Sequence, residues 1–103
     1  MDIQLKRGLL EICVLAAIKY EESYGYKIIK DVKPYISISE STLYPILKRL
    51  EEAGCLNVRS AEHNGRLRKY YCITDVGRQR LGQFADEWQE IMSVYNYVIR
   101  EGD

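Results

Sequence analysis

Residues 39–74 constrain the fold more than any other part of the sequence. An amphipathic helical pattern in this segment stops at Gly54, and two short runs rich in apolar, β-branched or aromatic residues follow at about 56–60 and 68–73. An Asn-Gly pair at positions 64 and 65 lies between these runs, and such a pair between two strands is a strong signal for a tight hairpin. The segment therefore predicts one helix followed directly by a small antiparallel β-hairpin.

The helical pattern before Gly54 gives the expected helix one apolar and one polar face. Apolar residues recur at intervals of three and four, namely at Leu43, Ile46, Leu47 and Leu50. The opposite face carries Ser41, Tyr44, Pro45, Lys48 and Glu52. Proline removes a backbone donor and crowds the preceding turn, so it fits best near a helix start. This favours Ser41 over Ser39 as the capping residue, or else a distorted first turn. The helix would close at Gly54, where a left-handed conformation is easy.

Two further helices are expected before this segment. The first, from about Leu5 to Tyr20, is apolar on two faces, and a chain of 103 residues has little to cover the second face. One face consists of Leu5, Leu9, Ile12 and Ala16, and the other of Leu10, Cys13, Val14 and Ala17. The second helix, about 24–33, would be capped by Ser23 and ended by Pro34. It would turn Tyr26, Ile29 and Val32 inward and leave Lys27, Lys30 and Lys33 outside.

The tail predicts a long helix that the small core cannot cover. Thr74 and Asp75 form a start signal, and glycines at 77 and 82 are the only breakers before Gly102. Such a helix would be roughly 40 Å long at 1.5 Å per residue. Its apolar seam has coiled-coil spacing and consists of Leu81, Phe84, Trp88, Ile91, Tyr95 and Val98, with Ala85, Met92 and Ile99 widening it. We expect this seam to pack on a second copy of the chain, together with Leu9 and Ile12 of the first helix.

Charge is distributed unevenly, although fifteen basic and fifteen acidic residues give a formal net charge of zero. Residues 19–80 hold twelve Lys or Arg against eight Asp or Glu, whereas residues 81–103 hold one against five. The expected hairpin contains Arg59, Arg66, Arg68 and Lys69 against Glu62. Basic groups at the tip of a hairpin suit the phosphate oxygens and the minor groove of DNA. The middle of the chain can therefore face DNA, whereas the acidic tail cannot.

Signals for an enzyme, a metal site or a membrane segment are absent from the sequence. Cys13, Cys55 and Cys72 form no C-x-x-C pair, so we expect three small buried residues and neither a disulfide framework nor zinc. His63 is the only histidine and has no Cys or Glu partner at a ligand or triad spacing. The apolar run at 9–18 is too short to span a bilayer. We expect a cytoplasmic protein without cofactor, metal or membrane contact.

The order helix, helix, turn, helix, hairpin, helix is that of a winged helix-turn-helix, whose third helix enters the major groove while the hairpin, or wing, contacts the flanking backbone. We predict a mainly α fold with a small β-hairpin. Residues 1–74 would form the DNA-binding domain and residues 75–103 the C-terminal dimerisation helix, in one compact unit. The alternative function is a winged-helix protein-interaction adaptor without DNA binding, which the acidic tail and the zero net charge favour.

Four stretches of the sequence resemble the PadR family of bacterial transcriptional regulators. They are LLEICVLAAI in the first helix, YGYKIIKDV in the second, SESTLYPILKRLEEAGCL in the third and RLRKYYCITDVGRQRL after the hairpin tip. The resemblance covers residues 8–81 and is to the shorter branch, with one C-terminal helix. It implies a homodimeric, often autoregulatory repressor that a small effector releases from its operator. It also implies that the last helix packs against the first helix of the other subunit.

The resemblance further assigns roles to single residues. It places Tyr44 on the DNA-facing side of the third helix, Tyr24 as a candidate phosphate contact and Tyr26 in the core. The neighbours of Tyr44 on that side are Ser41, Thr42 and Lys48. The wing would contribute Asn64, Gly65, Arg66 and Arg68, and two basic residues, Lys69 and Lys27, complete the DNA-binding set.

Trp88 has two open roles at the level of the sequence. In several PadR-like regulators flat aromatic or drug-like molecules bind between the helices of the dimer, and Trp88, with Met92 and Tyr95 near it, lies where such an effector could stack. Trp88 would serve equally well as an anchor of the dimer interface, because tryptophan is enriched at interface hot spots.

Overall fold

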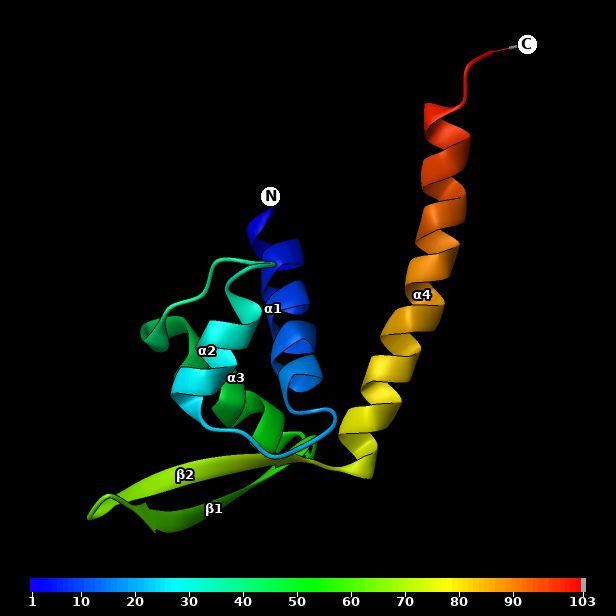
Figure 1. Ribbon diagram of the computed structural model, residues 1–103. Coiled ribbons are helices and arrows are strands. Elements are labelled where there is room, and N and C mark those ends of the chain that lie inside the picture. Colours follow the sequence, from blue (N-terminus) through cyan, green and yellow to red (C-terminus); the bar gives the residue numbers. More distant parts are fainter. Residues whose placement is uncertain (103) are drawn as a thin grey trace.

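The computed structural model describes residues 1–102 and contains four helices and one two-stranded antiparallel sheet (Figure 1). The elements in chain order are α1 (Ile3–Ala17), α2 (Gly25–Val32), α3 (Glu40–Glu52), β1 (Leu56–His63), β2 (Arg66–Ile73) and α4 (Asp75–Ile99). The predicted order of elements and the mainly α fold with a small β-hairpin are confirmed. Asp103, the last residue of the predicted tail, lies outside the described residues.

The core lies between α1, α2, α3 and the base of the hairpin. The predicted apolar stripe of α3 is buried, as expected. On α1 the stripe that contains Leu10 and Val14 faces this core, together with Leu15, which belonged to neither expected stripe. The stripe that begins at Leu5 faces away from the core, and the Leu5 side chain is half exposed. The two apolar faces of α1 therefore serve different contacts.

The residue that caps α2 differs from the predicted one. Tyr24 is the N-cap residue, so the expected capping role of Ser23 is wrong. Ser23 is 1% exposed, and its backbone N–H and carbonyl are hydrogen-bonded to the backbone of Tyr71 in β2, at 3.1 and 2.8 Å. A residue held in this way by a strand edge cannot also turn its side chain toward the first turn of the helix.

The buried face of α2 is also rotated relative to the prediction. Gly25, Ile28 and Val32 form it, whereas Tyr26, expected in the core, is 70% exposed. Residues two positions apart lie about 200° apart around a helix, so burial of Ile28 turns Tyr26 outward.

α3 begins two residues before the position that Pro45 favoured. Ser39 and not Ser41 is its N-cap residue, and two backbone N–H groups bond to the Ser39 carbonyl to close the first turn. Pro45 leaves the Ser41 carbonyl without its helical donor, but both residues are exposed, so water can bond to that carbonyl. The helix stops at Gly54 as predicted, and this glycine has a φ of +76°.

The hairpin is longer than predicted, with eight residues in each strand, and it has the expected two-residue turn. Asn64 and Gly65 both have positive φ, 52° and 78°, which is the combination of a type I′ turn. Side chains alternate between the two faces of a strand, so Tyr71 is buried while Cys72 after it is exposed. The expectation of three buried cysteines is therefore wrong for Cys72, and Cys13 is only partly buried.

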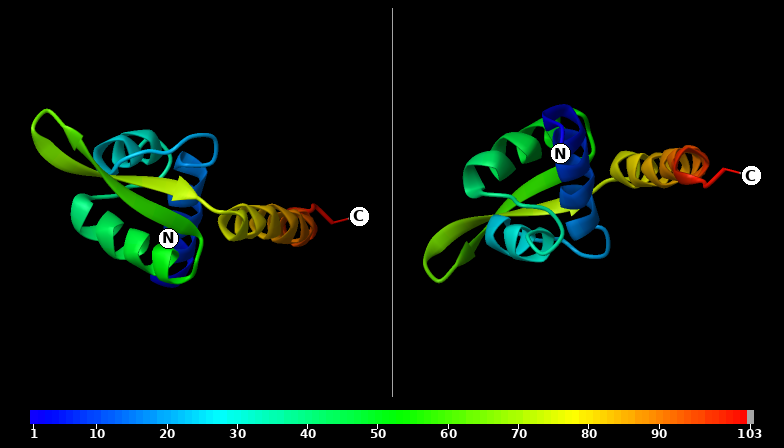
Figure 2. Two further views of the ribbon diagram at one scale, coloured as in Figure 1. Left: turned by 90° about the horizontal axis from the view of Figure 1, so that it is seen from below. Right: turned by 90° about the horizontal axis from the view of Figure 1, so that it is seen from above.

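α4 leaves the core and projects away from it, which Figure 1 and both views of Figure 2 show. Thr74 caps the helix as predicted, and its hydroxyl accepts a hydrogen bond from the Gly77 N–H at 3.1 Å. Residues 91–102 are all exposed. The radius of gyration is 16.2 Å, against about 13 Å for a compact chain of this size. Much of the apolar seam is therefore uncovered in a single copy.

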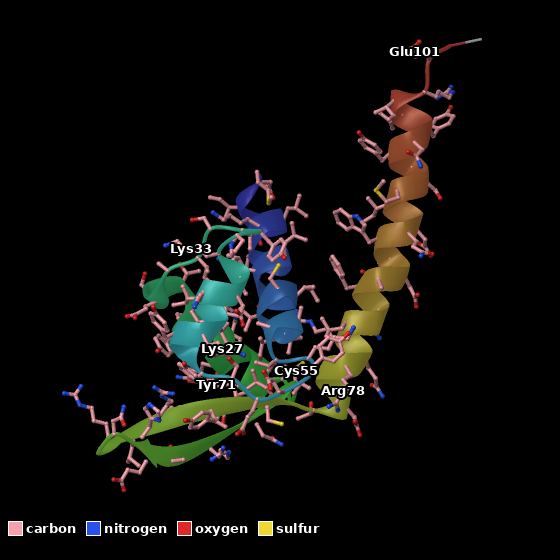
Figure 3. The ribbon with its side chains drawn as sticks, in the orientation of Figure 1. Lys27, Lys33, Cys55, Tyr71, Arg78 and Glu101 are labelled. Atoms are coloured by element: carbon pink, nitrogen blue, oxygen red, sulfur yellow. The ribbon has the colours of Figure 1, made fainter. Side chains whose placement is uncertain are left out.

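The junction of α3, the hairpin and α4 is closely packed. A Cβ atom on Gly77 would lie 2.3 Å from the Cys55 carbonyl oxygen and 2.7 Å from Ile73 Cγ1. The same carbonyl accepts a hydrogen bond from the Thr74 N–H at 3.1 Å, and the Thr74 hydroxyl donates to the Gly54 carbonyl at 2.6 Å. Figure 3 shows Cys55 at this meeting point. Gly77, a helix breaker by its sequence, is the residue that permits the close approach.

Candidate nucleic-acid interface

A groove of about 820 Å³ lies between the hairpin and the starts of α2 and α3. It brings together these residues predicted to contact DNA: Tyr24, Tyr44, Asn64, Arg66, Arg68 and Lys69. It also contains residues that the sequence did not assign to this surface: Gly25, Tyr26, His63, Leu67 and Tyr71. Guanidinium, ammonium and tyrosine hydroxyl groups are all donors to phosphate oxygens. The composition of the groove therefore fits a polyanion.

Other predicted DNA contacts lie around this groove. Lys48 faces a neighbouring hollow that also contains Tyr44 and Lys69. Ser41 and Thr42 are exposed near the start of α3. Gly65 lies in the turn of the hairpin, beside the groove. Thr42 lies apart from the rest of the predicted set, because it lines a hollow between α3 and the start of α1.

Lys27 is a predicted contact whose charge is already balanced. Its Nζ atom lies 3.2 Å from a carboxylate oxygen of Glu21 and 3.9 Å from one of Asp31. Figure 3 shows Lys27 on α2, above Tyr71 of the hairpin. Exposed ion pairs are weak, but these two reduce the positive charge that α2 offers to a phosphate.

Tyr44 rests against the start of α2. A Cβ atom on Gly25 would lie 2.6 Å from the Tyr44 hydroxyl oxygen and 3.2 Å from Tyr44 Cζ, so the glycine leaves the space that the ring occupies. The Tyr44 side chain is nevertheless 49% exposed. It therefore has a fixed base on α2 and an open edge toward the groove. Helical periodicity cannot reveal this contact, because the two residues belong to different helices.

The four basic residues of the hairpin, three arginines and one lysine, are not equally available to bind a phosphate. Within residues 1–102, no ion pair involves Arg66, Arg68 or Lys69. Arg59 is paired, because its Nε donates to Glu22 at 2.9 Å and its Nη2 donates to the other carboxylate oxygen. The hydrogen bond lowers the pKa of Glu22 and raises the pKa of Arg59. The charge that can reach a phosphate is therefore concentrated on β2.

His63 and Leu67 are groove residues that the sequence reading missed. With β1 expected to end near residue 60, position 63 counted as part of the loop. The longer strands pair His63 with Arg66 and Leu67 with Glu62, so both residues belong to the wing, which forms one wall of the groove. Tyr71 forms the buried floor of the groove, and burial raises the pKa of its hydroxyl. The signal that could have found them was the Asn-Gly turn, which fixes the register of the hairpin.

A second groove, of about 380 Å³, separates α1 from the first half of α4. It contains these predicted dimer residues: Leu9, Ile12, Phe84, Trp88 and Ile91. The rings of Phe84 and Trp88 are stacked, with centroids 5.6 Å apart. Leu81 packs partly against the core of its own chain. The remaining predicted seam residues, Met92, Tyr95, Val98 and Ile99, continue exposed along α4. Trp88 thus lines this groove, whereas the other two predicted effector contacts lie beyond it.

A single carboxylate ties α1 to both α3 and α4. Glu11 accepts from Arg49 Nε at 3.2 Å and from Arg80 Nη2 at 2.5 Å. Burial opposes the charge of Arg80, but the hydrogen-bonded Glu11 carboxylate favours it, and the pKa of Arg80 is raised. The three helices are therefore joined by polar contacts at the end of the groove, where Arg80 also forms part of the wall.

The family comparison decides between the classes of winged-helix protein. Residues 14–83 match the model of the transcriptional regulator PadR-like family. The match includes every residue of the groove between the hairpin, α2 and α3. This chain belongs to the PadR-like family. The resemblance drawn from the sequence motifs is confirmed.

Chains of known structure match this chain over almost its full length. A chain from Streptococcus mutans UA159 is 44% identical and has a TM-score of 0.79, with 93% of this chain and 94% of that chain covered. A transcriptional regulator from Clostridium thermocellum is 29% identical, with a TM-score of 0.84 and coverage of 97% and 99%. A PadR-like transcription factor from Bacteroides fragilis is 33% identical, with a TM-score of 0.83 and coverage of 92% and 94%. An uncharacterised Lysinibacillus sphaericus protein is 31% identical over 93 residues, 85% of each chain.

Membership in the PadR-like family makes this chain a DNA-binding transcriptional regulator and not an enzyme. Its fold is the winged helix of the family. α2 and α3 form the helix-turn-helix, and the hairpin is the wing. Among residues 1–102, no helix is long and apolar enough to cross a membrane. The family match ends at residue 83, so most of α4 lies outside it.

Proposed function

We propose that this PadR-like protein is a homodimeric repressor that binds an inverted-repeat operator through α3 and the wing. The proposal is carried by one observation: three basic residues of the wing, none paired within residues 1–102, surround the groove that contains the open edge of Tyr44. A two-fold dimer presents two such grooves, which suits an operator with two half-sites. The half-sites would lie one turn of duplex apart, or a multiple of it.

In this arrangement α3 enters the major groove and the wing follows the flanking backbone. The donors on α3 differ in length and would reach phosphates and base edges; they are Ser41, Thr42, Tyr44 and Lys48. The wing supplies Asn64, Gly65, Arg66, Arg68 and Lys69, near the narrow minor groove that attracts basic side chains. Phosphate contacts would contribute most of the affinity, and base contacts the specificity.

The dimer would be built from α4 and the outward face of α1, with α4 as the dimerisation helix. Three apolar residues with coiled-coil spacing, Ile91, Tyr95 and Val98, are between 48% and 69% exposed. A contiguous exposed apolar stripe marks a surface that another protein covers. A second copy of the chain offers the same stripe, and Leu9 and Ile12 beside the groove widen the contact.

A flat aromatic or drug-like effector would find a stacking surface at Trp88. This ring lines the groove between α1 and α4 and is already stacked on Phe84. Met92 and Tyr95 lie farther along α4, so an effector that touched all three residues would also need the surface of a partner. Trp88 then anchors the interface when no effector is bound.

The direct test is binding to the DNA upstream of the protein's own gene, measured by gel shift over a range of salt concentrations. Binding should weaken steeply with salt, since each neutralised phosphate contributes about −0.9 to the slope of log K against log salt. No retention on DNA at low salt would favour the protein-interaction adaptor. Repeating the assay with aromatic acids and cationic drugs tests release by an effector.

Tyr44→Ala should weaken binding to the operator by about tenfold or more, because a good base contact contributes roughly 1–3 kcal/mol of discrimination. Binding to random DNA should change much less. Competition gel shifts with both DNAs measure the difference. Tyr35→Ala is the matched control, since Tyr35 is an exposed tyrosine outside the groove. Equal losses on the two DNAs would reduce Tyr44 to a packing role.

Arg68→Ala should weaken binding to operator and random DNA alike and flatten the salt dependence by about one unit of slope. The physical reason is the loss of one phosphate contact. Arg78→Ala is the control, because Arg78 is paired with Asp75 at 3.2 Å at the start of α4. A slope unchanged from that of the natural protein would remove Arg68 from the backbone contacts.

A further inference from the structure

The guanidinium group of Arg68 lies over the ring of Tyr24 and close to that of Tyr70. Its Cζ atom lies 3.9 Å from the ring centroid of Tyr24 and 5.9 Å from that of Tyr70. A guanidinium above an aromatic face is attracted by the ring and still presents its N–H donors at its edge. No ion pair in the described part of the chain uses those donors. The stack therefore orients Arg68 and leaves it able to bind a phosphate.

The backbone fixes Tyr24 in this position. Ser23, the preceding residue, forms two backbone hydrogen bonds with Tyr71 and so adds a bridge at the edge of β2. The ring of Tyr24 also meets the ring of Tyr70 edge to face, with centroids 6.0 Å apart and planes at 75°. The connection before α2 thus behaves as a short third strand of the wing. The bridge therefore holds the backbone beside Tyr24 against β2, the strand that carries Arg68.

The neighbouring arginine is held in a different way. Arg59 lies 4.6 Å from the centroid of Tyr70, and its donors are used by the Glu22 carboxylate. Glu22 and Tyr24 both lie in the connection between α1 and α2. This one segment therefore neutralises the charge of Arg59 and places an aromatic ring under Arg68. The two arginines share one face of the hairpin, but only Arg68 keeps its donors for a ligand, as far as residues 1–102 are concerned.

We propose that Tyr24 is a positioning residue for Arg68. Its ring holds the guanidinium where it can bind a DNA phosphate, and its hydroxyl is not itself a ligand of DNA. This role differs from the phosphate contact expected from the sequence, and it rests on the proposed function because it requires that the wing contacts DNA. A side chain held in advance loses less rotamer freedom on binding, so affinity should depend on the ring of Tyr24.

The test is a double-mutant cycle on the upstream DNA fragment. Tyr24→Phe keeps the ring and should bind within about 1.5-fold of the natural protein, whereas Tyr24→Leu should bind about three- to tenfold more weakly. Combined with Arg68→Ala, Tyr24→Leu should cost no more than about 1.5-fold further, because the two residues act as one unit. Tyr20→Leu, a change at an exposed tyrosine whose ring faces Lys19 instead of Arg68, is the control. Thermal unfolding checks each variant, and Tyr24→Met replaces Tyr24→Leu if the leucine variant is unfolded.

Two results would overturn the proposal while the natural protein still binds DNA. If Tyr24→Phe binds as weakly as Tyr24→Leu, the hydroxyl is the ligand and the ring is not a platform. If Tyr24→Leu has the same cost with and without Arg68, or no cost at all, the ring does not act through Arg68. Failure of the proposed function would be seen differently, as absence of DNA binding by the natural protein.

Discussion

Gly77→Ala is expected to lower the free energy of unfolding by about 3 kcal/mol, because overpacking at a rigid contact costs about that much. The new Cβ would stand 2.3 Å from the Cys55 carbonyl oxygen, a backbone atom that cannot swing aside as a side chain could. Either the turn after α3 or the start of α4 must shift. At this chain length the loss corresponds to a fall of about 10 °C or more in Tm, which thermal denaturation followed by circular dichroism would measure.

Gly82→Ala is the matched control for this prediction. Gly82 lies in the same helix, and a Cβ atom there would meet nothing within 4 Å. Alanine favours a helix by up to about 1 kcal/mol over glycine, so this variant should be as stable as the natural protein or more so. Protein concentration must be the same for both, since the stability of a dimer depends on it. A Gly77→Ala variant with an unchanged Tm would mean that the junction is looser than its contacts indicate.

Trp88→Glu is expected to raise the dissociation constant of the proposed dimer by about 30-fold or more, since a tryptophan hot spot contributes 2 kcal/mol or more. The substitution places a carboxylate in an apolar seam, where burying a charge without a partner is costly. Sedimentation velocity at several protein concentrations should then show monomers. Operator binding should fall as well, because the two half-sites would no longer be bound by one linked molecule.

Gln89→Glu is the control for Trp88→Glu, since it adds the same charge at the next, exposed position of α4. This variant should remain a dimer and bind the operator. Persistent dimers of Trp88→Glu would place the seam on another face of α4 or on another element. They would also weaken the assignment of Trp88 as an interface anchor.

The parts of the fold that could be predicted are those encoded by local chemistry. The Asn-Gly pair at 64 and 65 requires two residues with positive φ, and this alone selects the turn. Thr74 carries the hydroxyl that caps α4, and Gly54 takes the left-handed conformation that closes α3. In each case the signal and the structure lie within a few residues of each other, so no knowledge of the packing was needed.

The errors arose where a distant contact overrode a local preference. Ser23 is a good capping residue by its chemistry, but the edge of β2 binds its backbone. Tyr26 fits an inward stripe by spacing, yet Ile28 and Val32 occupy the core and turn it outward. Pro45 argued for a later helix start, although one unpaired carbonyl on an exposed face is easily tolerated.

The candidate site shows the same division. The basic residues of the wing and the polar face of α3 could be read from the sequence, because charge and periodicity are visible there. Two contacts could not be read from the sequence: the ion pair of Arg59 with Glu22, and the packing of the Tyr44 ring against Gly25. Each joins segments that only the fold brings together. These contacts determine which of the visible groups are available to DNA.

The junction at Gly77 sets the angle between α4 and the rest of the chain. The Cys55 carbonyl, against which α4 begins, follows directly on the turn that ends α3, and the Glu11 carboxylate binds an arginine from each of these helices. α4 has 25 residues, so it is a lever about 37 Å long, and a change of 10° at its base moves its far end by about 6 Å. In the proposed dimer, the angle set at Gly77 would therefore be amplified along α4 and would determine the distance between the two DNA-binding domains.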